Sequence, residues 1–390
     1  MIEKEESETL DSIRGMAALL VLLTHVMQWF ICPLIGFDHL AVSVITHAAH
    51  FAVLVFFALS GYVITHSLVT NARRNDGQID AVAYTRSRLA RILPPALAAA
   101  LFSLAVAGLI HGLQMHGAES FRTEQDKWVE REAVSLRAKD VAATLLMSNG
   151  ILPGTKAIGV NPPMWSLSIE FWAYFIALLA ASAVCGSANQ GRAARSAGLI
   201  HTIAFLLLML IFAARPLAIS QYLFYWTIGA LWYFHRRHAR WVNAVFGVVV
   251  VLGMAAVPRC LALKEDWNLI FENGAAGVLG IPIKGALLIL LALTFPALRR
   301  LPTRRFFARV SRSSYTLYLF HYPMLCLIFS VFHLDYLDWG VWPRVLFLCV
   351  VTGGTVIACH LLATPLENKT AWLARADRVW ARGVPSRQDR

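Results

Sequence analysis

The chain has 390 residues and a formal net charge of +12 at pH 7; 58% of its residues are hydrophobic and only 15% are charged. Soluble domains carry about a quarter charged residues, so this composition excludes an ordinary soluble protein and favours an integral membrane protein. No pattern of interleaved basic and aromatic residues suggests a nucleic-acid partner, so the excess positive charge is expected to face anionic lipid or a phosphorylated ligand.

Apolar runs recur along the whole chain at close to the roughly 20 residues that a helix needs to cross a bilayer. We therefore predict an all-α, polytopic membrane protein with about ten transmembrane helices. The predicted spans are 15–35, 47–69, 92–113, 167–186, 199–214, 217–235, 242–258, 276–297, 314–334 and 341–364. The first is not a cleaved signal peptide, because its flank is acidic.

Basic residues predict the orientation. Most of the 35 Lys and Arg lie at the N-terminus, in four connecting segments and in the tail, whereas 36–46 and 335–340 contain none. By the positive-inside bias both termini are expected to be cytoplasmic. We expect one membrane domain over 1–366, with an outer loop at 114–164, and a basic cytoplasmic tail over 367–390. The four basic segments are 71–91, 187–198, 235–241 and 299–313.

The first span carries Arg14 and His25, which are 11 residues apart. On a helix this spacing gives about three turns, so both side chains share one face, with His25 about 16 Å further along. Ionisable groups inside a membrane are costly and often functional. The alternative is an arginine that snorkels to the interface and a histidine that is simply packed.

The second span contains Ser60-Gly61, small residues that either let helices pack closely or leave room for a ligand. At the entry of the third span, Arg88 and Arg91 point the same way on a helix. Arginine suits phosphate recognition, but two arginines here also fit a topology signal.

In the fourth span, Glu170 lies about 7 Å beyond the interfacial Trp165, where an isolated carboxylate would be expensive. It should therefore have a partner or a function. In the ninth span, Ser314, Tyr318 and His321 share one helix face, although a lone histidine there would more often belong to the core.

The six cysteines lie in or beside predicted helices with no C-x-x-C pair and no histidines at metal spacing. We therefore expect neither a disulfide framework nor a metal site.

Five motifs in order resemble the acyltransferase 3 family of membrane O-acyltransferases, over roughly residues 9–367. They are Arg14-x10-His25 within LDSIRGMAALLVLLTH, FFALSGYVIT (56–65), RSRLARILP (86–94), WSLSIE (165–170) and SYTLYLFHYP (314–323). The resemblance implies a ten-span enzyme of the inner membrane that moves an acyl group, usually acetyl, from cytoplasmic acyl-CoA to a hydroxyl. Acceptors in the family are sugars of exported polysaccharide, lipopolysaccharide or peptidoglycan, and for some members macrolide-type small molecules.

Two departures from the family are visible. The hydrolase-like domain fused to some members is missing, so a stand-alone enzyme is expected, with polysaccharide-assembly machinery as a candidate partner. The family often has a glutamate followed by proline near its last span, whereas here Pro365 precedes Glu367. No role is therefore assigned to Glu367.

The residues and the resemblance together suggest a mechanism with acyl-CoA as cosubstrate, no permanently bound cofactor, and a glycan or glycolipid as acceptor. His25 would be the base, since an imidazole with a pKa of about 6.5 suits proton transfer. Direct transfer and an acyl-enzyme relay both stay open, and a proton-coupled transporter is the alternative from another class. The expected roles are catalytic for His25, Arg14 and Glu170, acyl-CoA binding for Arg88, Arg91, Ser60 and Gly61, and acceptor binding for Trp165, Ser168, Tyr318 and His321.

Overall fold

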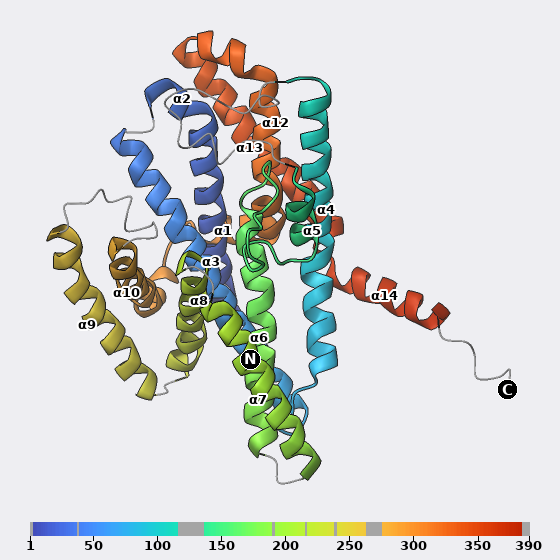
Figure 1. Ribbon diagram of the computed structural model, residues 1–390. Helices are drawn as coiled ribbons and strands as arrows, with labels where there is room; N and C mark the ends of the chain where they lie inside the picture. The colour runs from blue at the N-terminus through green and yellow to red at the C-terminus, as the bar shows by residue number, and fades with distance from the viewer. Residues whose placement is uncertain are drawn as a thin grey trace.

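The computed structural model describes residues 3–36, 39–115, 136–188, 192–214, 217–237, 240–262 and 275–383. All regular structure within these ranges is helical (Figure 1). Eight helical segments of the described chain are long and apolar enough to cross a membrane. The prediction of an all-α, polytopic membrane protein is confirmed.

Ten long helices coincide with the ten predicted spans, although α8 is not among the eight and the apolar stretch of α7 is the shorter Gly198–Ala213. The boundary predicted between these two, at Arg215-Pro216, lies outside the described residues. The long helices are α1 (Lys4–Val26), α3 (Leu40–Arg74), α4 (Ala81–Gly112), α6 (Met164–Ala188), α7 (Arg192–Ala213), α8 (Leu217–Arg236), α9 (Arg240–Ala262), α10 (Ala275–Leu298), α12 (Ser314–Asp338) and α13 (Val341–Leu366).

Shorter helical pieces connect or extend the long ones. A π-helical turn, η1 (Met27–Ile31), and α2 (Cys32–Ile35) continue α1, and η4 (Ser311–Ser313) leads into α12. The others are α5 (Ala138–Leu145), α11 (Arg304–Val310) and α14 (Lys369–Gly383). Of the predicted outer loop, residues 116–135 lie outside the described residues, as do residues 384–390 of the predicted tail.

Five helices build the centre of the bundle. Helix α1 packs against α3 and α12, α12 packs against α4, and α6 contacts both α3 and α4. The remaining long helices are added around this centre: α7 lies on α6, α8 on α3, α13 on α12, and α9 and α10 pair beside α8 (Figure 1). Helix α14 extends away from the bundle and contacts it through α4.

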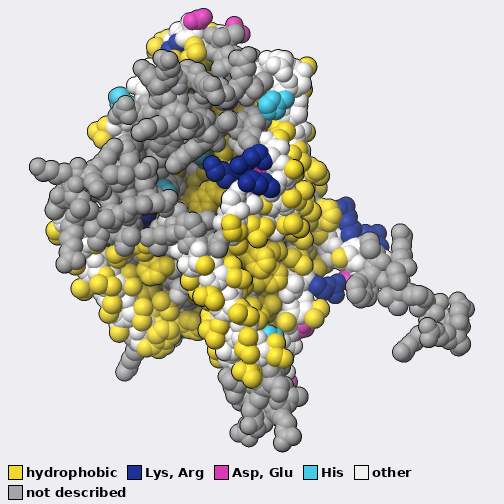
Figure 2. Space-filling view, viewed as in Figure 1, with side chains coloured by type: hydrophobic (Ala, Val, Ile, Leu, Met, Phe, Trp, Pro, Cys, Tyr) yellow, Lys and Arg dark blue, Asp and Glu magenta, His cyan; other side chains and the backbone are white. Residues whose placement is uncertain are grey.

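The outer surface of the bundle is apolar. Large hydrophobic side chains are exposed on the outward faces of several helices, among them Leu206 and Leu210 on α7, Val251 on α9 and Leu361 on α13. Figure 2 shows hydrophobic side chains covering much of one face of the helices. Such a continuous apolar surface would be an aggregation hazard in water, so it is the surface that lipid covers.

Candidate active site

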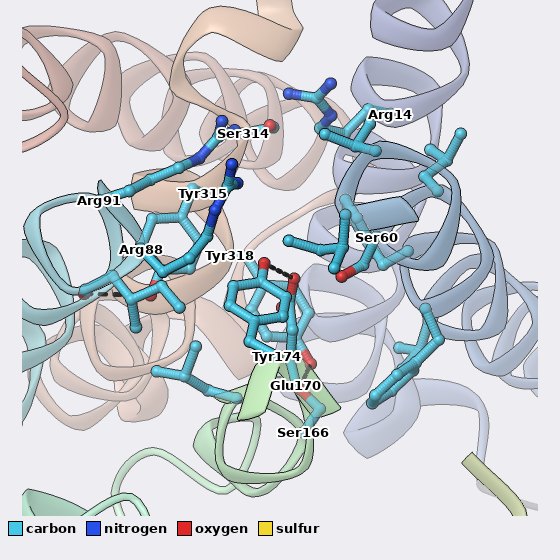
Figure 3. Close-up of a pocket in the computed structure, with 18 of the residues that line it drawn as sticks. Arg14, Ser60, Arg88, Arg91, Ser166, Glu170, Tyr174, Ser314, Tyr315 and Tyr318 are labelled. Atoms are coloured by element: carbon cyan, nitrogen blue, oxygen red, sulfur yellow. Dashed lines mark hydrogen bonds between the residues drawn. The ribbon is translucent and has the colours of Figure 1, made fainter. Parts of the chain in front are cut away.

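A cavity of about 110 Å³ lies between the five central helices. A buried water needs about 10–15 Å³, so this space holds several waters or a small group. Its walls combine apolar side chains of α3 with polar groups from every central helix and from the residue that ends α13 (Figure 3). The polar lining residues are Arg14, Ser60, Arg88, Arg91, Ser166, Glu170, Tyr174, Ser314, Tyr315, Tyr318 and Glu367.

Three arginines gather on one side of this cavity, which we call the basic side: Arg14, Arg88 and Arg91 (Figure 3). Arg14 forms an ion pair with Asp11, at 2.7 Å. Neither Arg88 nor Arg91 lies within 4.0 Å of a carboxylate oxygen among the described residues. Two adjacent guanidinium groups without carboxylate partners are suited to bind an anion.

Packing holds Arg88 in place. Its Nη2 donates a hydrogen bond to Ser67 Oγ, at 2.7 Å, and its guanidinium lies 5.4 Å from the centre of the Tyr84 ring. Its Nε is buried and has no hydrogen-bond partner in the part of the chain that the structure describes. A buried donor left unsatisfied is costly, which indicates that a ligand or water completes the site.

A second cavity, of about 490 Å³, adjoins the first and shares Arg88 and Arg91 with it. It is formed by the end of α3, the start of α4 and the start of α14, and it adds two further cations, Arg74 and Lys369. The two arginines of the basic side therefore stand between a small inner space and a larger, more open and positively charged one.

Two carboxylates line the first cavity. Glu170 Oε1 accepts a hydrogen bond from the Tyr174 hydroxyl, at 2.6 Å. Glu367, the residue after α13, accepts from both the backbone N–H and the hydroxyl of Thr316, at 2.9 and 2.6 Å. A carboxylate at this depth is expected to have a partner, and for Glu170 that partner is Tyr174, one turn along the same helix.

Tyr318 and Ser166 close the end of the cavity that lies away from the basic side. Their hydroxyl oxygens are 2.7 Å apart, and the Tyr318 hydroxyl is also 3.3 Å from the Pro163 carbonyl that it donates to. The ring of Phe56, another lining residue, meets that of Tyr318 edge to face at 5.6 Å.

His25 and His321 lie beyond this closed end and do not line the cavity. Their rings are 5.1 Å apart, and the Tyr318 ring is 6.0 Å from that of His321. His25 Nδ1 hydrogen-bonds to Gln28 Oε1, at 2.7 Å. The structure thus places Arg14 and Tyr318 at the cavity. His321 lies one turn beyond Tyr318 and His25 about three turns beyond Arg14, with the two rings against each other.

Four other predicted site residues divide between cavity and packing. Ser60 lines the cavity and accepts a hydrogen bond from Trp226 Nε1, at 3.3 Å. A Cβ on Gly61 would lie 2.0 Å from the Trp226 carbonyl oxygen of α8, which favours the helix-packing interpretation at this position. Trp165 packs against Tyr222, with ring centroids 4.7 Å apart and the ring planes tilted by 57°. Ser168 is fully buried and hydrogen-bonds to Asn149 of the predicted outer loop.

Sequence reasoning missed Glu367, Tyr174 and Tyr315 as cavity residues. The sequence assigns no role to Glu367, because its order with Pro365 departs from that of the family. The available signal was a single acidic residue at the end of the last apolar run, ahead of a basic tail. Tyr174 could have been found as the residue one turn after Glu170, whose side chain shares its helix face.

No group of three or more His, Cys, Asp or Glu in the described chain is arranged to hold a metal ion. No curated protein and no solved structure matches the chain. The sequence profile of a family described as an acyltransferase domain, the acyltransferase 3 family, matches residues 8–364. This match covers most of α1 through nearly all of α13, and with them every residue that lines the cavity except Glu367. The chain therefore belongs to the acyltransferase 3 family and is a membrane acyltransferase.

Proposed function

We propose that the protein is an O-acyltransferase of the inner membrane that takes its acyl group, acetyl, from cytoplasmic acyl-CoA. The acceptor is a hydroxyl of a sugar in an exported polysaccharide, lipopolysaccharide or glycolipid. In the reaction the thioester C–S bond breaks and an ester C–O bond forms, while the hydroxyl proton passes to the CoA thiolate. The observation that carries this proposal is the single cavity that joins Arg14, Arg88 and Arg91 to Glu170.

The donor is assigned to the basic side. Acyl-CoA is polyanionic at its nucleotide end and neutral at its thioester, so it needs a cationic entrance followed by a narrow, mostly apolar space. The larger cavity with Arg74 and Lys369 supports the nucleotide end, and the 110 Å³ cavity supports the acyl end. Arg88 and Arg91, which both cavities share, would bind phosphate between them.

His25 is the proposed base. In the amide orientation of the structure, Gln28 Oε1 accepts the proton of His25 Nδ1, which leaves Nε2 as the basic nitrogen. A base of this kind takes up the proton of the acceptor hydroxyl as it attacks the thioester carbonyl. Because the Tyr318 side chain lies between the cavity and the two histidines, this step requires the Tyr318 side chain to move or its hydroxyl to pass the proton on. Arg14 lies on the same helix face but about 16 Å before His25 by the rise of a helix, so it would act at the donor end, where its charge adds to the basic side that holds acyl-CoA.

Glu170 is assigned to the acceptor. It lies on the first turns of α6, on the predicted outer side, where a sugar would arrive, and its carboxylate is a hydrogen-bond acceptor for hydroxyl groups. The Tyr174 hydroxyl fixes one of its oxygens and leaves the other for a ligand. Trp165, Ser168, Tyr318 and His321 remain the proposed surroundings of the acceptor.

The test is binding of radiolabelled acetyl-CoA to purified protein in detergent. Arg88→Ala and Arg91→Ala should each weaken binding by about tenfold or more, as expected for the loss of a charged hydrogen bond of about 1.5–3 kcal/mol. Arg309→Ala is the matched control, because Arg309 is an exposed arginine that lines neither cavity. Failure of the wild-type protein to bind acetyl-CoA would overturn the donor assignment.

The acceptor is tested in cells. Deletion of the gene should remove acyl groups from one class of surface glycan, which mass spectrometry of the polysaccharide and lipid glycans detects. Unchanged glycans, with loss of an acylated small molecule instead, would transfer the proposal to a macrolide-type acceptor.

A further inference from the structure

At the far end of the cavity, next to Val53 of α3, lie side chains from three helices, which we call the aromatic barrier: Phe56, Tyr318 and Ser166. Phe56 comes from α3, Tyr318 from α12 and Ser166 from α6. Each of them lines the cavity, and each contacts the next: Phe56 and Tyr318 through their rings at 5.6 Å, Tyr318 and Ser166 through their hydroxyls at 2.7 Å.

Helix direction gives the barrier its position. Helix α12 begins at Ser314, which lines the cavity, and one turn beyond Tyr318 it carries His321, which does not. Helix α1 runs the same way, with Arg14 at the cavity and His25 about 16 Å further on by the rise of a helix. The barrier therefore lies between the arginines and the pair of histidines (Figure 3 shows the cavity side).

The barrier is fixed on both sides. The Tyr318 hydroxyl donates to the carbonyl oxygen of Pro163, in the loop that enters α6, and accepts from the Ser166 hydroxyl. Behind it, the Tyr318 ring contacts His321, and His321 contacts His25. A tyrosine held at its hydroxyl and along its ring cannot turn aside without breaking these contacts.

We propose that Phe56 and Tyr318 limit the length of the acyl group that the site accepts. This inference rests on the proposed function, in which the acyl end of the donor points from Arg88 and Arg91 toward the histidines. A donor anchored at the arginines has to place both its pantetheine arm and its acyl group in this one cavity, so its acyl group comes to lie against the barrier. Each added methylene must displace a packed aromatic ring.

The size of the effect follows from hydrophobic pockets in general, in which one methylene changes discrimination by about 10–200-fold. Wild-type protein should therefore bind butyryl-CoA at least about tenfold more weakly than acetyl-CoA, and hexanoyl-CoA more weakly still. Phe56→Ala removes the ring at the barrier and should bring butyryl-CoA to within about threefold of acetyl-CoA, since the added space accepts the added methylenes.

The experiment measures displacement of radiolabelled acetyl-CoA by unlabelled acetyl-, butyryl- and hexanoyl-CoA, on purified full-length protein. Phe56→Trp makes the opposite change, because it adds volume at the same place. It should lower the affinity for butyryl-CoA below that of the wild-type protein. Phe51→Ala is the matched control, because Phe51 is a half-buried phenylalanine of the same helix that does not line the cavity.

The outcomes separate the inference from the proposed function. If wild-type protein binds no acyl-CoA, both are overturned. If it binds acetyl-CoA and butyryl-CoA equally, or if Phe56→Ala and Phe56→Trp leave the ratio at the wild-type value, only the barrier is overturned. The barrier is supported if Phe56→Ala raises the affinity for butyryl-CoA relative to acetyl-CoA while Phe51→Ala leaves this ratio unchanged. If the Phe56→Ala protein does not accumulate, the same ratio measured on Phe56→Trp decides.

Discussion

At the level of single residues, the two histidines have matching surroundings. His321 Nδ1 donates to the Leu317 carbonyl, at 2.8 Å, and its buried Nε2 has no hydrogen-bond partner in the described chain. His25 likewise commits Nδ1, to Gln28. In both rings the basic nitrogen is therefore Nε2, and a proton donor that entered between them could bond to either. A π-helical turn begins two residues after His25, and such turns are frequent at functional sites.

His25→Ala should reduce acyl transfer by about 100-fold or more, the range by which a general base contributes, while acetyl-CoA binding stays within about twofold of wild type. The reason is that His25 lies beyond the barrier and outside the donor cavity. Turnover and acetyl-CoA affinity should be measured on the same purified sample. His201→Ala on α7 is the control, and full activity of well-expressed His25→Ala protein would refute the assignment.

Glu170→Gln and Glu367→Gln should separate the two carboxylates of the cavity. Glu170→Gln keeps the shape but loses the charge on the acceptor side, so it should lower turnover by about tenfold or more with acetyl-CoA affinity unchanged.

Glu367→Gln weakens the two hydrogen bonds that hold the start of α12. Hydrogen bonds to a charged group contribute about 1.5–3 kcal/mol, so this variant should lower the melting temperature. Equal loss of acetyl-CoA binding in both variants would contradict this division.

Five of the candidate site residues that the sequence indicates line one cavity in the structure, although their roles stay predictions: Arg14, Arg88, Arg91, Glu170 and Tyr318. The sequence could not separate candidate residues that line the cavity from candidates one turn away on the same helix face. Which of them reaches the cavity depends on how the helices cross. His25 and Arg14 do share a face, yet the Tyr318 ring from α12 takes the space in front of the histidines.

At the level of helices, the contact between α3 and α8 depends on two glycines, one on each helix, and each of them lies against the backbone of the opposite helix. A Cβ on Gly61 would lie 2.0 Å from the carbonyl oxygen of Trp226, and one on Gly229 would lie 1.8 Å from that of Ala58. Both are far below van der Waals contact, so the helices approach as closely as they do only because these residues lack side chains. Neighbours on the same turns, Ser60 and Leu59, line the cavity, so this close approach also positions its wall.

Gly61→Ala should therefore destabilise the protein by about 1–3 kcal/mol, the usual cost of overpacking, because backbone cannot yield as a flexible side chain can. Thermal unfolding in detergent measures this as a lower melting temperature. Gly108→Ala on α4 is the matched control, since nothing lies within 4 Å of a Cβ there, and it should leave the melting temperature unchanged or raise it. A Gly61→Ala protein with an unchanged melting temperature would show that α3 and α8 move apart at little cost.

Helix positions were predictable because each apolar run is long and bounded by charge or proline. The pairing of the helices was not predictable from the sequence. In a membrane, lipid-facing and core-facing residues are equally apolar, so the hydrophobic pattern along a helix does not show which face is buried. Helix α14 was expected only as a basic tail. It forms because Lys369–Gly383 is free of proline, and its start contributes Lys369 to the larger cavity.

For the molecule as a whole, the donor and acceptor assignment requires that the basic side and the outer loop face opposite compartments. Six arginines lie between residues 299 and 313, and one of them, Arg304, contacts Glu5 and Glu8 near the N-terminus. The outer loop and this segment are separated by five long helices, α6 to α10, an odd number of crossings. We therefore expect 299–313 in the cytoplasm and 136–163 outside.

Single cysteines test this orientation in a background without the native six cysteines. In intact cells, a membrane-impermeant thiol reagent should label Lys156→Cys and should not label Thr303→Cys, whereas both should react after the cells are opened. Both positions are exposed, so a missing reaction in intact cells reports the compartment and not burial. The reverse pattern would put Arg88 and Arg91 on the side that holds no acyl-CoA. The phosphate-binding role of the basic side, the direction of the acyl group toward His25 and the length limit at Phe56 would then all have to be abandoned together.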